Sequence, residues 1–181
     1  MRAVVLGAVL LAGVGLVGCS SSSPAADAPQ PSGSSGGIAG VKTYTDLTRN
    51  HTTADVTYPQ TPPVGGDHDP DWIDCTGQVY TQPLRNENAV HSLEHGAVWL
   101  TYNSDVSSKD VATLAKQVDG RQYSFMSPYP DQPAPIMLTA WGLQLSVDSA
   151  TDPRIDEFLS TYAQGPQTPE PNAPCAGGIM P

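Results

Sequence analysis

The chain has 181 residues, of which 18 are acidic and 8 are basic, and its formal net charge at pH 7 is −10. A negative charge of this size argues against nucleic acid as a partner and against a basic surface that binds anionic lipid. Without the N-terminal signal described next, about 160 residues remain, enough for one domain with a sizeable core.

The N-terminus has the three parts of a bacterial secretory signal. Arg2 supplies a positive charge, residues 3–17 are apolar without charge or proline, and residues 16–19 read Leu-Val-Gly-Cys. This box resembles the lipobox that lipoprotein signal peptidase cuts. The apolar run is shorter than the roughly 20 residues that span a bilayer. We therefore predict a cleaved lipoprotein signal peptide over residues 1–18 rather than a transmembrane helix.

Cleavage would leave Cys19 at the new N-terminus, where lipoproteins carry acyl chains such as palmitate. Two or more chains hold a protein stably at a membrane. We therefore expect a lipid-anchored, extracytoplasmic protein on the outer face of the bacterial cell membrane, held there through Cys19. The sequence does not identify a protein partner.

The composition of the rest of the chain indicates three parts. Residues 19–37 are rich in Ser, Pro, Ala and Gly, which is typical of a disordered tether. We predict a globular domain over residues 38–165 and a Pro-rich C-terminal tail over residues 166–181. With Cys19 lipidated, Cys75 and Cys175 form an even pair, which in an oxidising compartment predicts a disulfide. A thiolate metal site or a redox pair is the alternative.

Hydrophobic periodicity divides the domain into helices and strands. A first helix is predicted over residues 86–95, capped by Asn86 or Asn88 and ended by Gly96. Two further helices are predicted over residues 108–119 and from Asp152 onward. Strands are predicted at residues 41–47, 55–58, 97–102 and 122–127, with a strand or hairpin arm at 136–147 interrupted by Gly142, and a long loop at 59–76.

From residue 97 onward the predicted order is strand, helix, strand, strand, helix. This order resembles part of a split β-α-β unit, in which helices cover one face of a mixed sheet. We predict a single α+β domain, with a small mixed β-sheet covered by two or three helices and a long irregular N-terminal loop region.

Three histidines could form a metal site. His91 and His95 lie at positions i and i+4 of the predicted helix, about 5–6 Å apart at Cβ, so both could bind one ion. His68, in the Pro-rich loop, would complete a site for copper or zinc. We expect Glu94 to point to a different side, and His51 to lie in a turn. The leading hypothesis is a transition-metal binding module.

Two other interpretations remain open. In the first, the protein is a structural or interaction lipoprotein, with His91 bonded to the Pro-rich loop and His95 capping its own helix. In the second, residues 91–95 match the His-x-x-Glu-His pattern of a zinc hydrolase, with Glu94 as general base and Glu157 as a third ligand. The motif is short and the domain small, so we expect a binding protein rather than an enzyme.

Two methionines are candidate soft ligands for Cu(I). Met126 and Met137 each stand beside an apolar residue in a predicted strand, a position typical of the core. The chain has no serine nucleophile elbow, phosphate-binding loop or dinucleotide fingerprint. Metal binding is therefore the chemistry that the sequence indicates best.

Several segments together resemble one known family. Residues 86–102 read NENAVHSLEHGAVWLTY, which closely resembles the signature of the domain of unknown function 3105 family. Residues 62–68 (PPVGGDH) look like its Pro-Pro-x-x-Gly-x-His loop, and residues 127–130 and 140–142 look like its later markers. Members of this family are mostly bacterial exported or membrane-anchored proteins.

The resemblance spans about residues 40–175, nearly the whole predicted domain. It implies that His68, His91 and His95 belong to family motifs. It also argues against a pitrilysin-type protease, whose motif belongs to a larger and different context.

Overall fold

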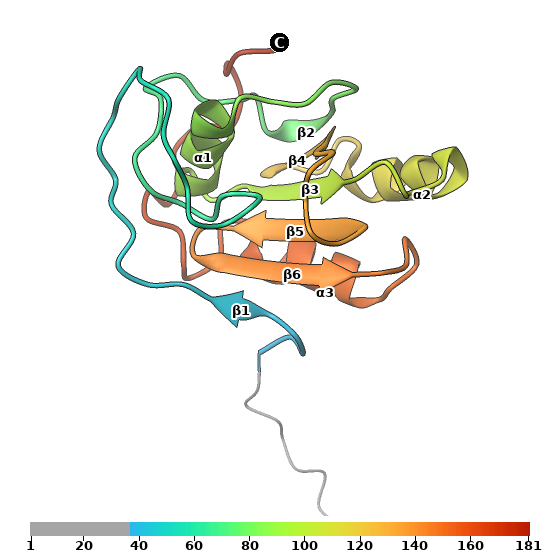
Figure 1. Ribbon diagram of the computed structural model, residues 1–181. Helices are drawn as coiled ribbons and strands as arrows, with labels where there is room; N and C mark the ends of the chain where they lie inside the picture. The colour runs from blue at the N-terminus through green and yellow to red at the C-terminus, as the bar shows by residue number, and fades with distance from the viewer. Residues whose placement is uncertain (1–36) are drawn as a thin grey trace, which may run out of the picture. The chain divides into compact units, whose positions relative to one another are not determined.

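The computed structural model describes residues 37–181 (Figure 1). The predicted signal peptide, Cys19 and all but the last residue of the predicted tether lie outside the described residues. Within residues 37–181, no helix is both long and apolar enough to cross a membrane.

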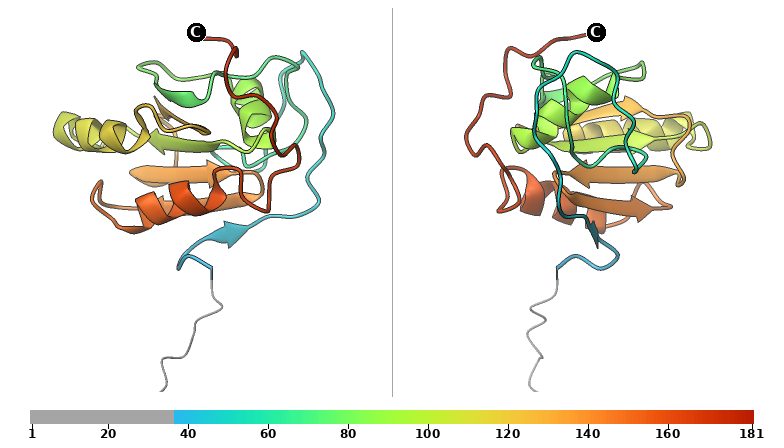
Figure 2. Two further views of the ribbon diagram at one scale, coloured as in Figure 1. Left: turned by 180° about the vertical axis from the view of Figure 1, so that it is seen from behind. Right: turned by 60° about the vertical axis from the view of Figure 1, so that its left-hand side comes forward.

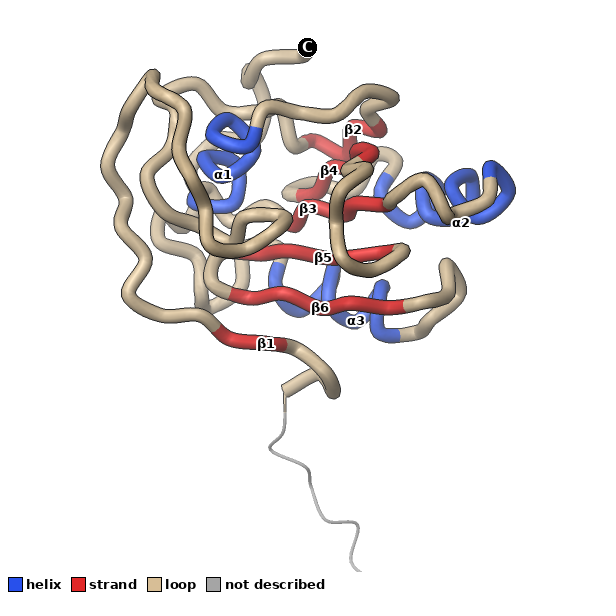
Figure 3. Tube along the Cα trace, in the orientation of Figure 1, coloured by secondary structure: helices blue, strands red, loops and turns tan. Residues whose placement is uncertain are grey.

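The described chain is α+β, as predicted, with three helices and one mixed sheet of six strands (Figure 3). The elements in chain order are β1 (Lys42–Thr43), β2 (Thr76–Val79), α1 (Asn86–Glu94), β3 (Val98–Tyr102), α2 (Ser108–Val118), β4 (Ser124–Pro128), β5 (Ile136–Ala140), β6 (Leu143–Val147) and α3 (Arg154–Tyr162).

The strand order in the sheet is β1-β6-β5-β3-β4-β2. Strand β4 pairs in parallel with both β2 and β3, whereas the β3–β5, β5–β6 and β1–β6 pairs are antiparallel. The β2-α1-β3 connection therefore crosses over β4. A split β-α-β arrangement is thus present, as predicted, but it lies at β2-α1-β3 rather than from residue 97 onward, where β3-α2-β4 joins neighbouring parallel strands. Gly142, with a φ of 69°, forms the tight turn between β5 and β6.

Helices cover both faces of the sheet, and not one face as predicted. Alternating side chains of β3 point to opposite faces, so Leu100 packs with α2 and α3 while Trp99 packs with α1. Viewed from behind, α3 lies in front of the sheet (Figure 2). Each buried Leu or Phe contributes about 1.5–3 kcal/mol to folding. The α2–α3 face is filled by Leu100, Leu114, Val118, Met126, Leu138, Leu145, Ile155 and Phe158.

Four details of the predicted elements are wrong. The strand predicted over residues 41–47 is limited to β1, Lys42–Thr43. Residues 55–58 are extended but form no strand, because the Val56 N–H donates to the Glu87 side chain (2.7 Å) rather than to a neighbouring strand. Strand β2 was not predicted, since it is short and contains Gly77. Helix α1 begins after Arg85 without a side-chain cap, while the Asn88 amide donates to the Asp71 carbonyl instead.

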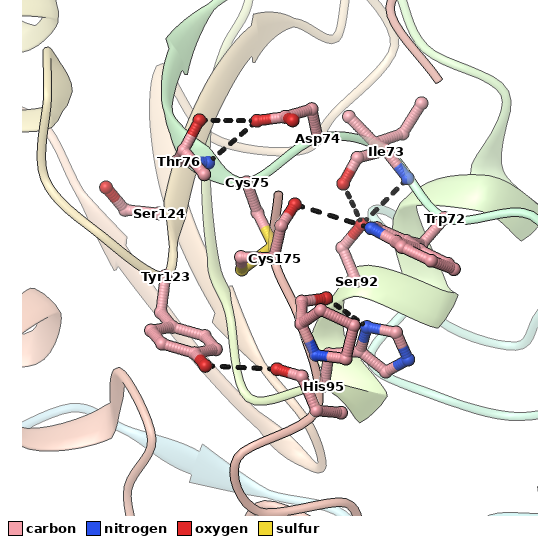
Figure 4. Close-up of a disulfide and its surroundings, with 12 residues drawn as sticks. Trp72, Ile73, Asp74, Cys75, Thr76, Ser92, His95, Tyr123, Ser124 and Cys175 are labelled. Atoms are coloured by element: carbon pink, nitrogen blue, oxygen red, sulfur yellow. Dashed lines mark hydrogen bonds between the residues drawn. A yellow bond between two sulfur atoms is a disulfide. The ribbon is translucent and has the colours of Figure 1, made fainter. Parts of the chain in front are cut away.

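A disulfide joins Cys75, just before β2, to Cys175 near the C-terminus (Figure 4). The Trp72 indole N–H donates to the Cys175 carbonyl (3.3 Å), and the Tyr123 hydroxyl donates to the Ala173 carbonyl (3.0 Å). The last residues of the chain therefore pack against the domain beside the C-terminal end of α1.

Candidate metal centre

Helix α1 carries two side chains of the site. His91 and Glu94 are three positions apart, and residues with this spacing lie on the same side of a helix. Both are buried. The prediction that Glu94 points to a different side from the histidines is therefore wrong. Glu94 does point away from its direct neighbour His95, but it shares a side of the helix with His91, three positions earlier.

Two irregular segments supply the other histidines. The Thr52 N–H donates to the His68 carbonyl (2.7 Å) and the His68 N–H donates to the Asn50 carbonyl (3.0 Å). This short parallel pairing brings His51 beside His68, with ring centroids 4.9 Å apart. The His91 ring lies 5.0 Å from the His51 ring and 4.9 Å from the His68 ring.

We call His51, His68, His91 and Glu94 the His–Glu tetrad. Their ligand atoms all lie within 4.8 Å of one another. In a tetrahedral site with metal–ligand bonds of about 2.0–2.2 Å, two ligand atoms lie about 3.3–3.6 Å apart. The widest separations in the tetrad must therefore shorten by about 1 Å around an ion. His51 is exposed and lies in an irregular segment, so it is the ligand best able to move.

Backbone carbonyls orient two of the rings. The Nδ1 of His68 lies 2.8 Å from the Gly66 oxygen, and the Nδ1 of His91 lies 2.7 Å from the Asp69 oxygen. A carbonyl only accepts hydrogen bonds, so each Nδ1 carries the proton. In the neutral ring, Nε2 then has a free lone pair. Metal-binding histidines are commonly oriented in this way.

His68 and Glu94 form the closest contact of the tetrad. The Nε2 of His68 lies 2.8 Å from Oε2 of Glu94, yet the direction of approach does not give a well-formed hydrogen bond. Because Nδ1 already carries a proton, a neutral His68 would direct its lone pair at a carboxylate. Such a contact is favourable only when a cation is present, either a second proton on His68 or a metal ion bound to both groups.

Electrostatics distinguish the two rings. Burial is the largest influence on His68 and acts to lower its pKa, but the contacts with Glu94 and the Gly66 carbonyl raise that pKa above its usual value. For Glu94, burial acts to raise the pKa, and His68 outweighs it, so the pKa of the carboxyl is lowered. His91 behaves differently: burial, then the neighbouring His95 and His68, lower its pKa to about 4. His91 is therefore neutral at pH 7.

His95 lies beside the tetrad but is not part of it. Its Nδ1 is bonded to the Pro174 carbonyl (2.8 Å), and its Nε2 lies 3.7 Å from the Glu170 carboxylate. The predicted cap on its own helix is thus replaced by contacts with the C-terminal residues. Its ring also packs against Trp72, with centroids 5.0 Å apart.

Of the three histidines predicted as ligands, the structure brings His68 and His91 into the tetrad, and it adds His51 and Glu94. His51 was missed because nothing in its spacing links it to the other histidines. Met126 and Met137 are buried in the core, and Glu157 is exposed on α3. None of these three belongs to the ligand group found among the described residues.

Solvent reaches the tetrad from one side. A polar pocket there is lined by Arg49, Asn50, His51, Glu94 and Glu170. Two of these residues belong to the tetrad, whereas His68 and His91 are buried behind them. An ion held by the tetrad would therefore face the pocket.

The fold and site define an α+β protein with a largely buried His–Glu cluster. The chain belongs to the family described as protein of unknown function (DUF3105), whose model matches residues 50–177. That range contains the whole tetrad and both cysteines of the disulfide. No curated protein and no solved structure matches the chain.

Proposed function

We propose that the protein is a lipid-anchored extracytoplasmic module that binds one transition-metal ion through His51, His68, His91 and Glu94. The metal-binding part rests on the described domain. The anchoring part rests on the Leu-Val-Gly-Cys box that ends in Cys19.

The observation that carries metal binding is the contact between His68 and Glu94. Two buried groups meet at 2.8 Å, and the Gly66 carbonyl holds the His68 proton on the far side of the ring. A cation bound between the His68 lone pair and the Glu94 carboxylate would remove the repulsion between them. The neutral His91 would bind the same cation. The arrangement thus supplies a carboxylate, a neutral His91 and an orienting outer shell, and His68, whose pKa is raised, would release its second proton on binding the metal.

The ligand types favour particular metals. Three imidazoles and one carboxylate suit zinc, copper(II) and iron, whereas copper(I) prefers sulfur ligands. Met126 lies in the core on the α2–α3 side, whereas Met137 is buried on the other face of β5, and the tetrad itself contains no sulfur ligand. Zinc and copper(II) are therefore the metals that we propose, in preference to copper(I).

The test of metal binding is the metal content of the full chain, expressed with export and purified without a histidine tag or chelator. We expect about one equivalent of metal per chain, and its loss in a His68→Ala/His91→Ala double variant. A structural role for these histidines predicts a lower melting temperature in the same variant, with no metal in the native protein. Native protein that neither contains nor takes up zinc or copper contradicts the proposal.

Anchoring is tested separately by cell fractionation. We expect the native chain in the membrane fraction with labelled palmitate incorporated, and no incorporation into a Cys19→Ser variant, because serine cannot accept the lipid. Equal palmitate incorporation by the two proteins contradicts anchoring through Cys19 and leaves metal binding unaffected.

A further inference from the structure

The polar pocket beside the tetrad has one unusual arginine. Of the four arginines within residues 37–181, three form ion pairs: Arg85 with Asp69 and Glu87, Arg121 with Asp156, and Arg154 with Asp152. Arg49, which lines the pocket, forms none with the described acidic groups. A free guanidinium in a chain of net charge −10 is available to an anion from solution.

The tetrad and the pocket share a boundary. His51 and Glu94 are members of the tetrad and also line the pocket, together with Arg49. An ion with four protein ligands can accept one or two more when it becomes five- or six-coordinate. Since His68 and His91 are buried, those further positions would face the pocket.

Charge indicates the kind of ligand. With a divalent ion bound, the charges of Glu94, Glu170 and Arg49 leave one net positive charge, because histidines bind a metal ion as neutral imidazoles. A single monoanion neutralises this charge, whereas a dianion would be opposed by the exposed Glu170 carboxylate on the pocket wall. Guanidinium and carboxylate match each other in geometry and bind through charge-assisted hydrogen bonds.

We propose that the pocket binds a small monocarboxylate, with one oxygen on the tetrad metal and the other on the Arg49 guanidinium. This inference rests on the proposed metal site. It names the class of ligand that the centre takes from solution, beyond the metal itself. Arg49 then determines specificity for an anion, and Glu170 selects a single negative charge over two.

The experiment loads the full chain with cobalt(II) or copper(II), whose d–d absorption reports changes in coordination. Acetate, formate and phosphate are then titrated into the loaded protein. We expect acetate and formate to shift the absorption band with a saturable response, and phosphate to bind more weakly. An Arg49→Met variant should keep one equivalent of metal and lose about 10- to 100-fold in acetate affinity.

Two further variants sharpen the test. Arg121→Met removes an arginine that follows α2, pairs with Asp156 of α3 and does not line the pocket, so this variant should bind acetate as the native protein does. Glu170→Gln should strengthen phosphate binding relative to acetate. A loaded native protein whose spectrum does not respond to acetate overturns this proposal alone, as does native-like acetate binding by Arg49→Met. Failure to load any metal overturns the metal site first.

Discussion

The imidazole of His91 lies 2.7 Å from the backbone oxygen of Asp69, so one hydrogen bond connects α1 to the loop that carries His68. Asp69 is itself fixed, because its carboxylate lies 2.5 Å from Nη1 of Arg85. Arg85 also contacts the Glu87 carboxylate (3.2 Å) and donates to the Thr53 carbonyl (3.2 Å), close to His51. One arginine thus connects all three segments that supply the tetrad.

From this network we predict that Arg85→Met lowers metal affinity by about 10- to 100-fold, the usual effect of losing an outer-shell partner. The metal should still bind with one equivalent, because no ligand is removed. Competition with a chelator of known affinity measures the change. Arg85→Lys, which keeps the charge but not the forked geometry, should recover only part of the affinity. Native-like affinity in Arg85→Met, at unchanged fold content by circular dichroism, contradicts the prediction.

A second prediction separates His51 from His95. His51→Ala removes a tetrad ligand at an exposed position, so we expect native thermal stability without metal and at least a tenfold loss of metal affinity. His95→Gln retains a donor for the Pro174 carbonyl and should leave both the metal stoichiometry and affinity unchanged. The opposite result, with binding lost in His95→Gln and kept in His51→Ala, would restore the ligand set predicted from the sequence.

The third prediction concerns pH and the metal-free protein. The pKa of His91 is lowered to about 4 by burial, and that of His95 is lowered for the same principal reason. The unfolded chain therefore binds more protons than the folded chain as pH falls from about 6.5 towards 4, and acidification destabilises the fold. His68, whose pKa is raised, opposes this trend, because the stability it contributes is present below about pH 6.5 and is lost as pH rises through its folded pKa.

The lowered pKa values of His91 and His95 make the fold less stable at low pH, and only His68 has the opposite effect. We therefore expect the melting temperature of metal-free protein to be lower at pH 5.5 than at pH 7.5 by about 5 °C or more. Thermal denaturation followed by circular dichroism in the presence of chelator measures this difference. In His91→Gln the difference between the two pH values should become smaller, whatever the absolute stability of the variant. A metal-free protein that is more stable at pH 5.5 would indicate that the His68–Glu94 ion pair dominates.

The disulfide gives a fourth prediction. It closes a loop of 100 residues, and removing a native bridge of this kind costs about 2–5 kcal/mol. We expect a Cys75→Ala/Cys175→Ala variant to unfold at a lower urea concentration than the native protein, with a similar dependence on denaturant. Reduction of the native protein should produce the same shift. Equal midpoints for oxidised and reduced protein contradict a stabilising role.

Local signals explain which parts of the fold were predictable. Helix α2 has a clear apolar stripe, and α1 ends at Glu94, two residues before Gly96, whose φ of 91° suits glycine. Strand β2 has no such signal, because its place at the sheet edge depends on pairing with β4, which lies 45 or more residues further along the chain. The extended residues 55–58 carry a strand-like pattern, but side-chain contacts with Glu87 replace strand pairing.

The metal centre was predictable only in part, for a related reason. The spacing of His91 and His95 indicates a shared helix face, and their rings lie 4.5 Å apart, yet it cannot show that the C-terminal residues bond to His95, which is not a member of the tetrad. The role of His51 depends on the backbone pairing of two irregular segments, which leaves no periodic pattern in the sequence. Long-range contacts, rather than helix geometry, therefore determine the ligand set.

The Cys75–Cys175 bridge has a consequence for the order in which the protein matures. The C-terminal residues that it fastens supply the Pro174 carbonyl for His95, and the Glu170 N–H that donates to the carbonyl of Glu94 (3.1 Å). In a reducing cytosol the bridge does not form, and these residues are not held covalently over the end of α1. A chain secreted before it oxidises would complete the pocket beside the tetrad only outside the cell. As a metal-binding protein it would then take its ion from outside the cell and would not compete for metal ions in the cytosol.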